Sequence, residues 1–152
     1  LLQFVMHSLS PKNKRKARII ALKIIYAIEF NGSNIDDTCK FIFDLDQTPE
    51  NKIIQYSKHL CKLTLNHIID VDILIKDHSR NWDFNRITIM DLLIMRMSLA
   101  EMLFEEGVPP KVSITEGVEI AKQFSTSDSS SFINGILDAI YNDKKNKLDQ
   151  IN

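Results

Sequence analysis

The chain has 152 residues, of which 44% are apolar and 26% are charged, and its net charge at pH 7 is −1. This length suffices for one domain with a full hydrophobic core, and the composition excludes a disordered or fibrous protein. Glycine and proline number only four each, so long periodic segments with few turns predict an all-α fold. No apolar run reaches the ~20 residues that span a membrane, and we expect no membrane partner.

The chain opens with LLQFVMHSLS, which lacks a methionine at position 1 and is too short for a signal peptide. We interpret residues 1–10 as an expression remnant or a frayed leader, with Met6 as an alternative start. Residues 11–143 are interpreted as a single domain and residues 144–152 as a loose tail.

The first predicted helix runs from about Asn13 to Phe30 and ends at Asn31-Gly32, a C-cap signal. Residues 1–30 hold six cations and one acid, a charge of +5. Residues 31–152 hold 13 cations and 19 acids, a charge of −6. A basic start on a mildly acidic body indicates an anionic partner.

Helical spacing gives this first helix two faces. The core face comprises Ala17, Ile20, Ala21, Ile24, Ile25 and Ile28, and the opposite face comprises Lys12, Arg15, Lys16, Ile19, Lys23 and Tyr26. Cations in a first turn oppose the helix dipole and one another, whereas they add to the affinity of free N–H groups for phosphate. We interpret the basic cluster as a polyanion site; a solvated basic face is the alternative.

The next elements in chain order are a short helix, a turn and a long helix. The short helix covers roughly Asn34 to Leu45, and in the turn at residues 46–49 Thr48 caps a helix that has Pro49 at its first position. The 3.6-residue period then predicts one helix from Pro49 to Asp77. His78 to Asn85 form a connector that contains the only tryptophan, Trp82.

Ile87 to Glu105 are apolar around most of the helix circumference, which predicts a central buried helix. Arg96 lies among apolar residues, so we expect its guanidinium to pair with a carboxylate or to reach solvent at the core edge. The more polar face carries acids and methionines and is either a docking strip or a half-buried edge. Its members are Asp91, Ile94, Met95, Ser98, Glu101, Met102 and Glu105.

Two further helices follow, over Val112–Phe124 and about Ser129–Asn142, separated by a polar turn. Ser127 or Asp128 is the expected N-cap. Gly135 predicts close packing against a neighbour. Phe124 and Phe132 are either core residues or platforms on which a single-stranded base stacks.

Reactive side chains show no catalytic or metal-binding spacing. Cys39 and Cys61 form no C-x-x-C, and Cys61 falls on an apolar stripe, so we expect it to be a buried reduced thiol, which suits the cytoplasm. The four histidines are scattered. We therefore expect no catalytic residue, no metal and no cofactor.

Residues 108–138 read VPPKVSITEGVEIAKQFSTSDSSSFINGILD. This segment resembles the NusB transcription antitermination family at Val108, Pro109, Lys111, Val112, Ile114, Glu116, Glu119, Ala121, Lys122, Phe124, Asp128, Phe132, Asn134, Gly135, Leu137 and Asp138. Upstream matches are Trp82, Arg86, Asp91, Leu93, Ile94, Arg96 and Glu101, and the basic start KRKAR followed by Tyr26 resembles the family's first helix. The likeness covers about residues 14–140.

The resemblance implies an all-α domain of two small packed helical subdomains with about six to seven helices and no catalysis. It implies binding of boxA-type single-stranded RNA, usually with the ribosomal protein acting as NusE, within an RNA polymerase antitermination complex at ribosomal RNA operons. The implied RNA-binding residues are Lys14, Arg15, Lys16, Arg18, Lys122, Phe124 and Asp128. The implied partner-binding residues are Tyr26 and Asp91, which the helical wheel places away from the core faces.

The chain departs from the family pattern at three points. Ile19 stands where an acid is frequent, lysines replace some arginines of the first helix, and Ser125 replaces a frequent glycine. Two other functions remain open. One is a homodimeric interaction module that buries the Ile19 and Tyr26 stripe and excludes RNA. The other is a fragment of a ribosomal RNA methyltransferase, although no cofactor loop of the G-x-G type occurs.

Overall fold

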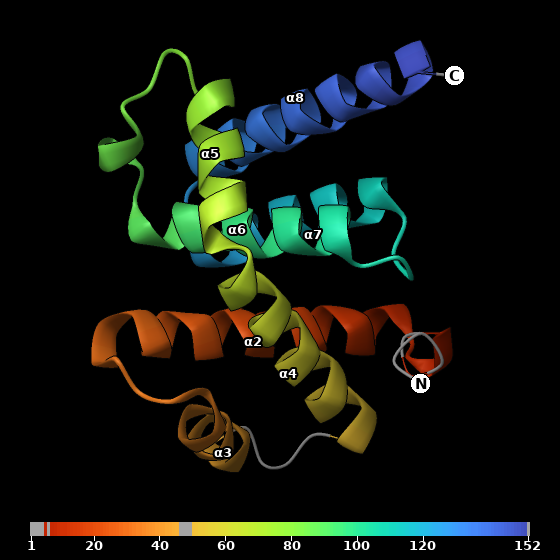
Figure 1. Ribbon diagram of the computed structural model, residues 1–152. Helices are drawn as coiled ribbons and strands as arrows, with labels where there is room; N and C mark the ends of the chain where they lie inside the picture. Colours follow the sequence, from red (N-terminus) through yellow and green to blue (C-terminus); the bar gives the residue numbers. More distant parts are fainter. Residues whose placement is uncertain (1–4, 6, 46–49, 152) are drawn as a thin grey trace. The chain divides into compact units, whose positions relative to one another are not determined.

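The computed structural model describes residue 5 and residues 7–45 and 50–151, and within these ranges every regular element is a helix. The chain divides into two compact units, residues 1–66 and 67–152. The elements of the first unit are α2 (Pro11–Asn31), α3 (Ile35–Leu45) and α4 (Asn51–Asn66). Those of the second are α5 (Ile68–His78), the 3-10 turn η1 (Phe84–Arg86), α6 (Ile89–Phe104), α7 (Pro110–Phe124) and α8 (Ser127–Ile151). Figure 1 labels the α-helices of both units. The all-α prediction is confirmed.

The first unit is built on α2, which packs against both α3 and α4. Ser10 caps its N-terminus by accepting a hydrogen bond from the Asn13 N–H, and Gly32 ends it with φ of 61°, a conformation that glycine adopts at little cost. Ser57 of α4 donates a hydrogen bond of 3.1 Å to the Ala17 carbonyl. This contact ties the two helices together at the end of α2 that carries the cations.

The predicted core face of α2 is confirmed except at Ile28, which is half-buried. Burial also extends to Arg18 and Leu22, because α2 has neighbours on two sides rather than one. Upstream, Val5 and Leu9 are buried, so the described part of the leader packs rather than frays.

Two predictions between α3 and α5 have different outcomes. The turn at residues 46–49, with Thr48 and Pro49, lies outside the described residues. The single helix from Pro49 to Asp77 is wrong, because the chain leaves helical geometry at His67, with φ −117° and ψ 17°. There the imidazole stacks on the Phe104 ring with centroids 3.7 Å apart. The apolar period continues on both sides of this break, so the sequence pattern did not indicate that the helix is interrupted.

In the second unit α6 packs against α5, α7 and α8. Arg96 donates two hydrogen bonds to Asp72 of α5, of 2.8 and 2.7 Å, which confirms the predicted pairing with a carboxylate. Ser113 of α7 donates to the buried Glu101 carboxylate at 2.8 Å. The polar face of α6 is not a docking strip, since Asp91, Ser98, Glu101, Met95 and Met102 are all buried.

Close helix packing is found at Gly117 and not at Gly135. A Cβ at Gly117 would collide with the Ser98 hydroxyl and lie 3.2 Å from the Ser98 Cβ, whereas a Cβ at Gly135 would meet nothing within 4 Å. The absence of a side chain at Gly117 lets α7 approach α6. The sequence therefore assigned close packing to the wrong glycine.

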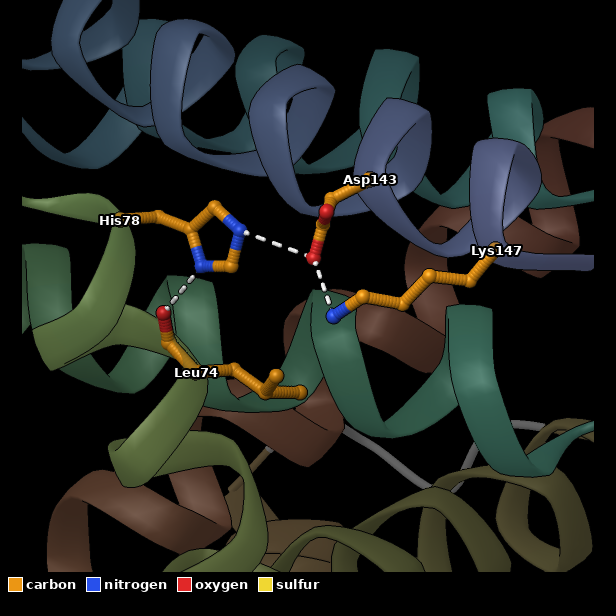
Figure 2. A network of polar contacts seen from close by, with 4 residues as sticks. All are labelled: Leu74, His78, Asp143 and Lys147. Atoms are coloured by element: carbon orange, nitrogen blue, oxygen red, sulfur yellow. Dashed lines mark hydrogen bonds and ion pairs between the residues drawn. The ribbon is translucent and has the colours of Figure 1, made fainter. Parts of the chain in front are cut away.

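The last helix, α8, is longer than predicted at both ends. Its N-cap is Thr126, whose hydroxyl accepts from the Ser129 N–H at 3.1 Å, rather than Ser127 or Asp128. At the other end, residues 144–151, expected as a loose tail, are helical. Figure 2 shows the contact between α8 and α5, in which Asp143 lies 3.6 Å from the His78 Nε2. Asp143 also accepts a hydrogen bond of 2.9 Å from Lys147 of its own helix.

Candidate nucleic-acid interface

The start of α2 carries the cationic face. Lys12, Arg15 and Lys16 are exposed, Lys14 is half-buried, and the first turn of this helix contains no acid. The Ser10 cap and Pro11 at the first position fix the helix start immediately before these side chains. Dipole and side chains therefore present positive charge at the same end, which is the arrangement that attracts phosphate.

Arg18 differs from the other predicted RNA-binding cations of α2, because only 3% of it is exposed. It shares a helical stripe with Leu22 and Ile25, which are also buried. The structure therefore separates Arg18 from the exposed cations, and the charge that faces solvent comes from its neighbours.

Tyr26 lies on the exposed face further along α2. It is 38% exposed, and its ring centroid is 4.6 Å from that of Phe30, which is 60% exposed. The predicted position of Tyr26 away from the core face is confirmed. The sequence did not single out Phe30, although its spacing of four residues from Tyr26 places both on one face.

In the second unit, the loop between α7 and α8 is held by Asp91. The Ser125 hydroxyl donates a hydrogen bond of 2.8 Å to the Asp91 carboxylate in the first turn of α6. Asp91 is only 5% exposed, so the wheel prediction that placed it away from the core is wrong. Its carboxylate is committed to the loop, and it also lies favourably at a helix N-terminus.

The three RNA-binding residues predicted in this unit lie on both sides of that loop. Lys122 is exposed and pairs with Glu119 at 3.0 Å, Phe124 is half-buried at the end of α7, and Asp128 is exposed in the first turn of α8. Asp91 and Asp128 both line a pocket of about 240 Å³, which neither Lys122 nor Phe124 lines.

Two aromatic rings join this pocket to a larger one. Trp82 is 61% exposed, and its ring centroid lies 5.4 Å from that of the half-buried Phe132. Both rings line the pocket with Asp128 and a second pocket of about 400 Å³, and exposed arginines contribute to each. These are Arg86 in the smaller pocket and Arg80 in the larger.

Trp82, Arg80 and Arg86 were not predicted as site residues. The available signal was the only tryptophan of the chain in a polar connector between two arginines. A large ring in such a segment is either buried by a neighbouring element or left exposed. Apolar periodicity does not distinguish these outcomes, because the connector has no periodic pattern.

Among the described residues, no group of three or more His, Cys, Asp or Glu side chains is placed to hold a metal ion. Over the same part of the chain, no helix combines the length and the apolar character needed to cross a membrane. The features that stand out are thus a cationic helix start in one unit and an aromatic, arginine-flanked pair of pockets in the other.

Known proteins that resemble this chain identify its family. The model of the NusB family matches residues 15–142. Transcription antitermination protein NusB of Chloroherpeton thalassium is 41% identical over 135 residues, which are 89% of this chain and 64% of that protein. The protein of the same name from Salinibacter ruber is 36% identical over 130 residues, which are 84% of this chain and 80% of that protein. The chain belongs to the NusB family.

Solved structures agree on the fold. T. maritima NusB is 31% identical with a TM-score of 0.74, and the match covers 83% of this chain and 88% of that one. A crystal structure of antitermination factors NusB and NusE in complex with dsRNA contains a chain with a TM-score of 0.79, covering 88% of this chain and 98% of that one. Its identity of 22% makes it evidence for the fold alone.

Proposed function

We propose that this protein is a transcription antitermination factor that binds boxA-type single-stranded RNA together with the ribosomal protein acting as NusE, as part of an RNA polymerase antitermination complex at ribosomal RNA operons. The exposed cationic start of α2 carries the proposal. Both curated relatives are named transcription antitermination proteins, and one neighbour of the same fold is solved with NusE and RNA. The chain spans 64% of the C. thalassium relative.

The RNA backbone and the RNA bases are bound by different features in this proposal. Lys12, Lys14, Arg15 and Lys16 neutralise phosphates, with the free N–H groups of the helix start nearby. In the second unit, bases stack on Trp82 and Phe132, which lie beside arginines. Lys122, Phe124 and Asp128 shape the adjoining loop.

Tyr26 and Asp91 have different parts in partner binding. Tyr26 with Phe30 offers an exposed aromatic pair that fits a protein contact with NusE. Asp91 acts indirectly, because its carboxylate holds Ser125 and so fixes the loop.

The same aromatic pair supports one alternative, a homodimer that buries the α2 face and keeps RNA out. Sedimentation of the free chain separates the two proposals. A stable dimer that binds no RNA at modest salt favours the alternative, whereas a monomer that binds RNA contradicts it. For either function we propose a cytoplasmic location, which the free, buried Cys39 and Cys61 support.

The experiment is fluorescence anisotropy with a short boxA-like RNA at several salt concentrations, with and without NusE. If about five phosphates are neutralised, log K falls against log salt with a slope of roughly −3.5. The double variant Arg15→Gln/Lys16→Gln should reduce that slope by about 1.4. The matched control Lys40→Gln/Lys52→Gln removes two exposed lysines elsewhere in the same unit and should leave the slope unchanged. A slope near zero in the wild type would refute the basic RNA site.

A further inference from the structure

The C-terminal turns of α8 form a groove with the end of α6 and the start of α7. Its volume is about 410 Å³. Six apolar or aromatic residues and two lysines line it: Met102, Leu103, Phe104, Pro110, Tyr141, Lys144, Lys145 and Leu148. A pocket of this size with an apolar lining and few charged groups has the general character of a binding site.

This groove is separate from the candidate RNA surface of the same unit. Asp91 lies in the first turn of α6 and Phe104 is its last residue, so the two ends are roughly 20 Å apart at 1.5 Å per residue. None of the residues that line the two pockets beside Trp82 lines the groove. The groove is therefore not part of the proposed RNA surface.

The wall formed by α8 contacts α5 through Asp143. Asp143 accepts a hydrogen bond from Lys147, and the His78 Nε2 lies 3.6 Å from the same carboxylate oxygen (Figure 2). The other nitrogen of His78 is 2.8 Å from the Leu74 carbonyl of α5. The contact with His78 holds against α5 the stretch of α8 that also bears Tyr141, Lys144, Lys145 and Leu148.

The exposed side chains of the groove define the chemistry of its occupant. Leu148 is 63% exposed and Phe104 is 39% exposed. In contrast to Lys147, neither Lys144 nor Lys145 has a carboxylate within ion-pair distance in the described part of the chain. These two lysines therefore add positive charge to the groove, although residues 31–152 together have a net charge of −6. The complement of this surface has large apolar side chains flanked by carboxylates.

We propose that this groove binds an acidic amphipathic helix of a protein partner, whose apolar face covers Phe104 and Leu148 and whose carboxylates pair with Lys144 and Lys145. Helix-in-groove binding uses apolar anchors spaced three or four residues apart on one face. The flanking charges favour an acidic partner over a neutral one and speed its association. This assigns to the protein a second binding surface that is independent of its RNA.

The probe is a fluorescein-labelled helical peptide of glutamate and leucine, about 15 residues long, with the leucines on one face. Its anisotropy is titrated with the full chain. Lys144→Gln/Lys145→Gln should weaken binding roughly fivefold, because each exposed pair contributes a fraction of a kcal/mol. Leu148→Asn should weaken it roughly tenfold through the lost apolar contact. All three side chains are exposed, so the variants keep the fold.

The control variant is Lys40→Gln/Lys52→Gln, which loses the same charge from exposed positions outside the groove and should bind the peptide as the wild type does. A second control is a peptide of the same composition with dispersed leucines, which should bind at least severalfold more weakly. Addition of boxA-like RNA should not displace the helical peptide, whether or not that RNA binds.

Several outcomes would overturn the proposal. One is absence of peptide binding, and another is equal binding by the wild type and both groove variants. A dimer that sediments as such and dissociates on Leu148→Asn would assign the groove to a second copy of the chain. Binding of dodecanoate that the peptide does not displace, and that Leu148→Asn abolishes, would assign it to a small amphiphile.

Discussion

Arg96 shows how a charged residue is accommodated between packed helices. The side chains of Arg96 and Asp72 are 11% and 16% exposed, and the guanidinium and the carboxylate meet through two hydrogen bonds. Such bidentate pairs have a specific geometry. Each charge offsets the cost of removing the other from water, so the loss of one partner leaves the other buried and unpaired.

Arg96→Met should therefore destabilise the protein by about 3 kcal/mol, because it leaves the Asp72 carboxylate unpaired and largely buried. The double variant Arg96→Met/Asp72→Leu should recover most of that loss. Urea unfolding of the four proteins in this cycle measures the coupling. A loss below about 0.5 kcal/mol for Arg96→Met would show that the pair behaves as a surface ion pair.

The two cysteines give a second prediction at the residue scale. Burial raises the pKa of the Cys61 thiol to about 12, with a further contribution from Cys39, whose own pKa burial also raises. The thiolate is the reactive form, so iodoacetamide at pH 8 should label neither cysteine in the folded protein and both in urea. Mass spectrometry reads the result, and rapid labelling in the folded state would contradict the burial.

At the scale of the element, the two glycines within helices provide matched substitutions. Gly117→Ala should destabilise the protein by about 2 kcal/mol, because the new Cβ collides with Ser98 and forces α7 away from α6. Gly135→Ala should stabilise it by about 0.5–1 kcal/mol, since a Cβ there meets nothing within 4 Å and alanine favours the helix. Thermal unfolding of both variants tests the difference, and a loss at Gly135 equal to that at Gly117 would contradict it.

The contacts that Asp143 makes with Lys147 and His78 should depend on pH. The hydrogen bond from Lys147 lowers the pKa of this carboxyl, and the charges of Lys147 and His78 act in the same direction. A lowered folded-state pKa means that this stabilisation is present above the unfolded pKa of about 3.9 and is lost as the pH falls through the lower folded value.

Asp143→Asn should consequently speed hydrogen exchange in the last turns of α8 at pH 7. The difference in exchange rate between the variant and the wild type should shrink as the pH falls below about 4. It should disappear once Asp143 of the wild type is protonated and is neutral like the asparagine of the variant. Unfolding midpoints at pH 7 and pH 3 provide a second readout. A difference of constant size across this range would show that the carboxylate charge does not hold the helix.

At the scale of the whole molecule, the two candidate RNA-contacting regions lie in different compact units. If one RNA contacts both, the second contact is intramolecular and raises the apparent affinity. An RNA of about 12 nucleotides should then bind at least tenfold more tightly than one of about 4 nucleotides. Trp82, the only tryptophan, reports on its own unit through fluorescence.

The decisive variant for this prediction is again Arg15→Gln/Lys16→Gln in the first unit. It should weaken the long RNA more than the short RNA, as measured by Trp82 quenching in the second unit. Equal effects on both lengths would show that the two units do not share one RNA. The control Lys40→Gln/Lys52→Gln should affect neither length.

Much of the fold was predictable because local spacing sets a helix and its phase. The apolar period, the Gly32 cap signal and the glycine-poor composition predicted the all-α class and the position of α2. The charge of +5 in residues 1–30 and the motif at residues 108–138 predicted a basic face and the family. These features depend on neighbours in sequence, so the sequence alone determined them.

Only the tertiary structure decided how much of each helix is covered and where a periodic segment breaks. Arg18 and Asp91 are buried because other helices or loops pack on those sides of their helices. A helical wheel considers one helix alone and therefore assigns these sides to solvent. His67 interrupts a continuous apolar period, and at this break its ring stacks on Phe104, which is distant in sequence. The pairing of Trp82 with Phe132 likewise joins residues 50 positions apart, a proximity that no local pattern records.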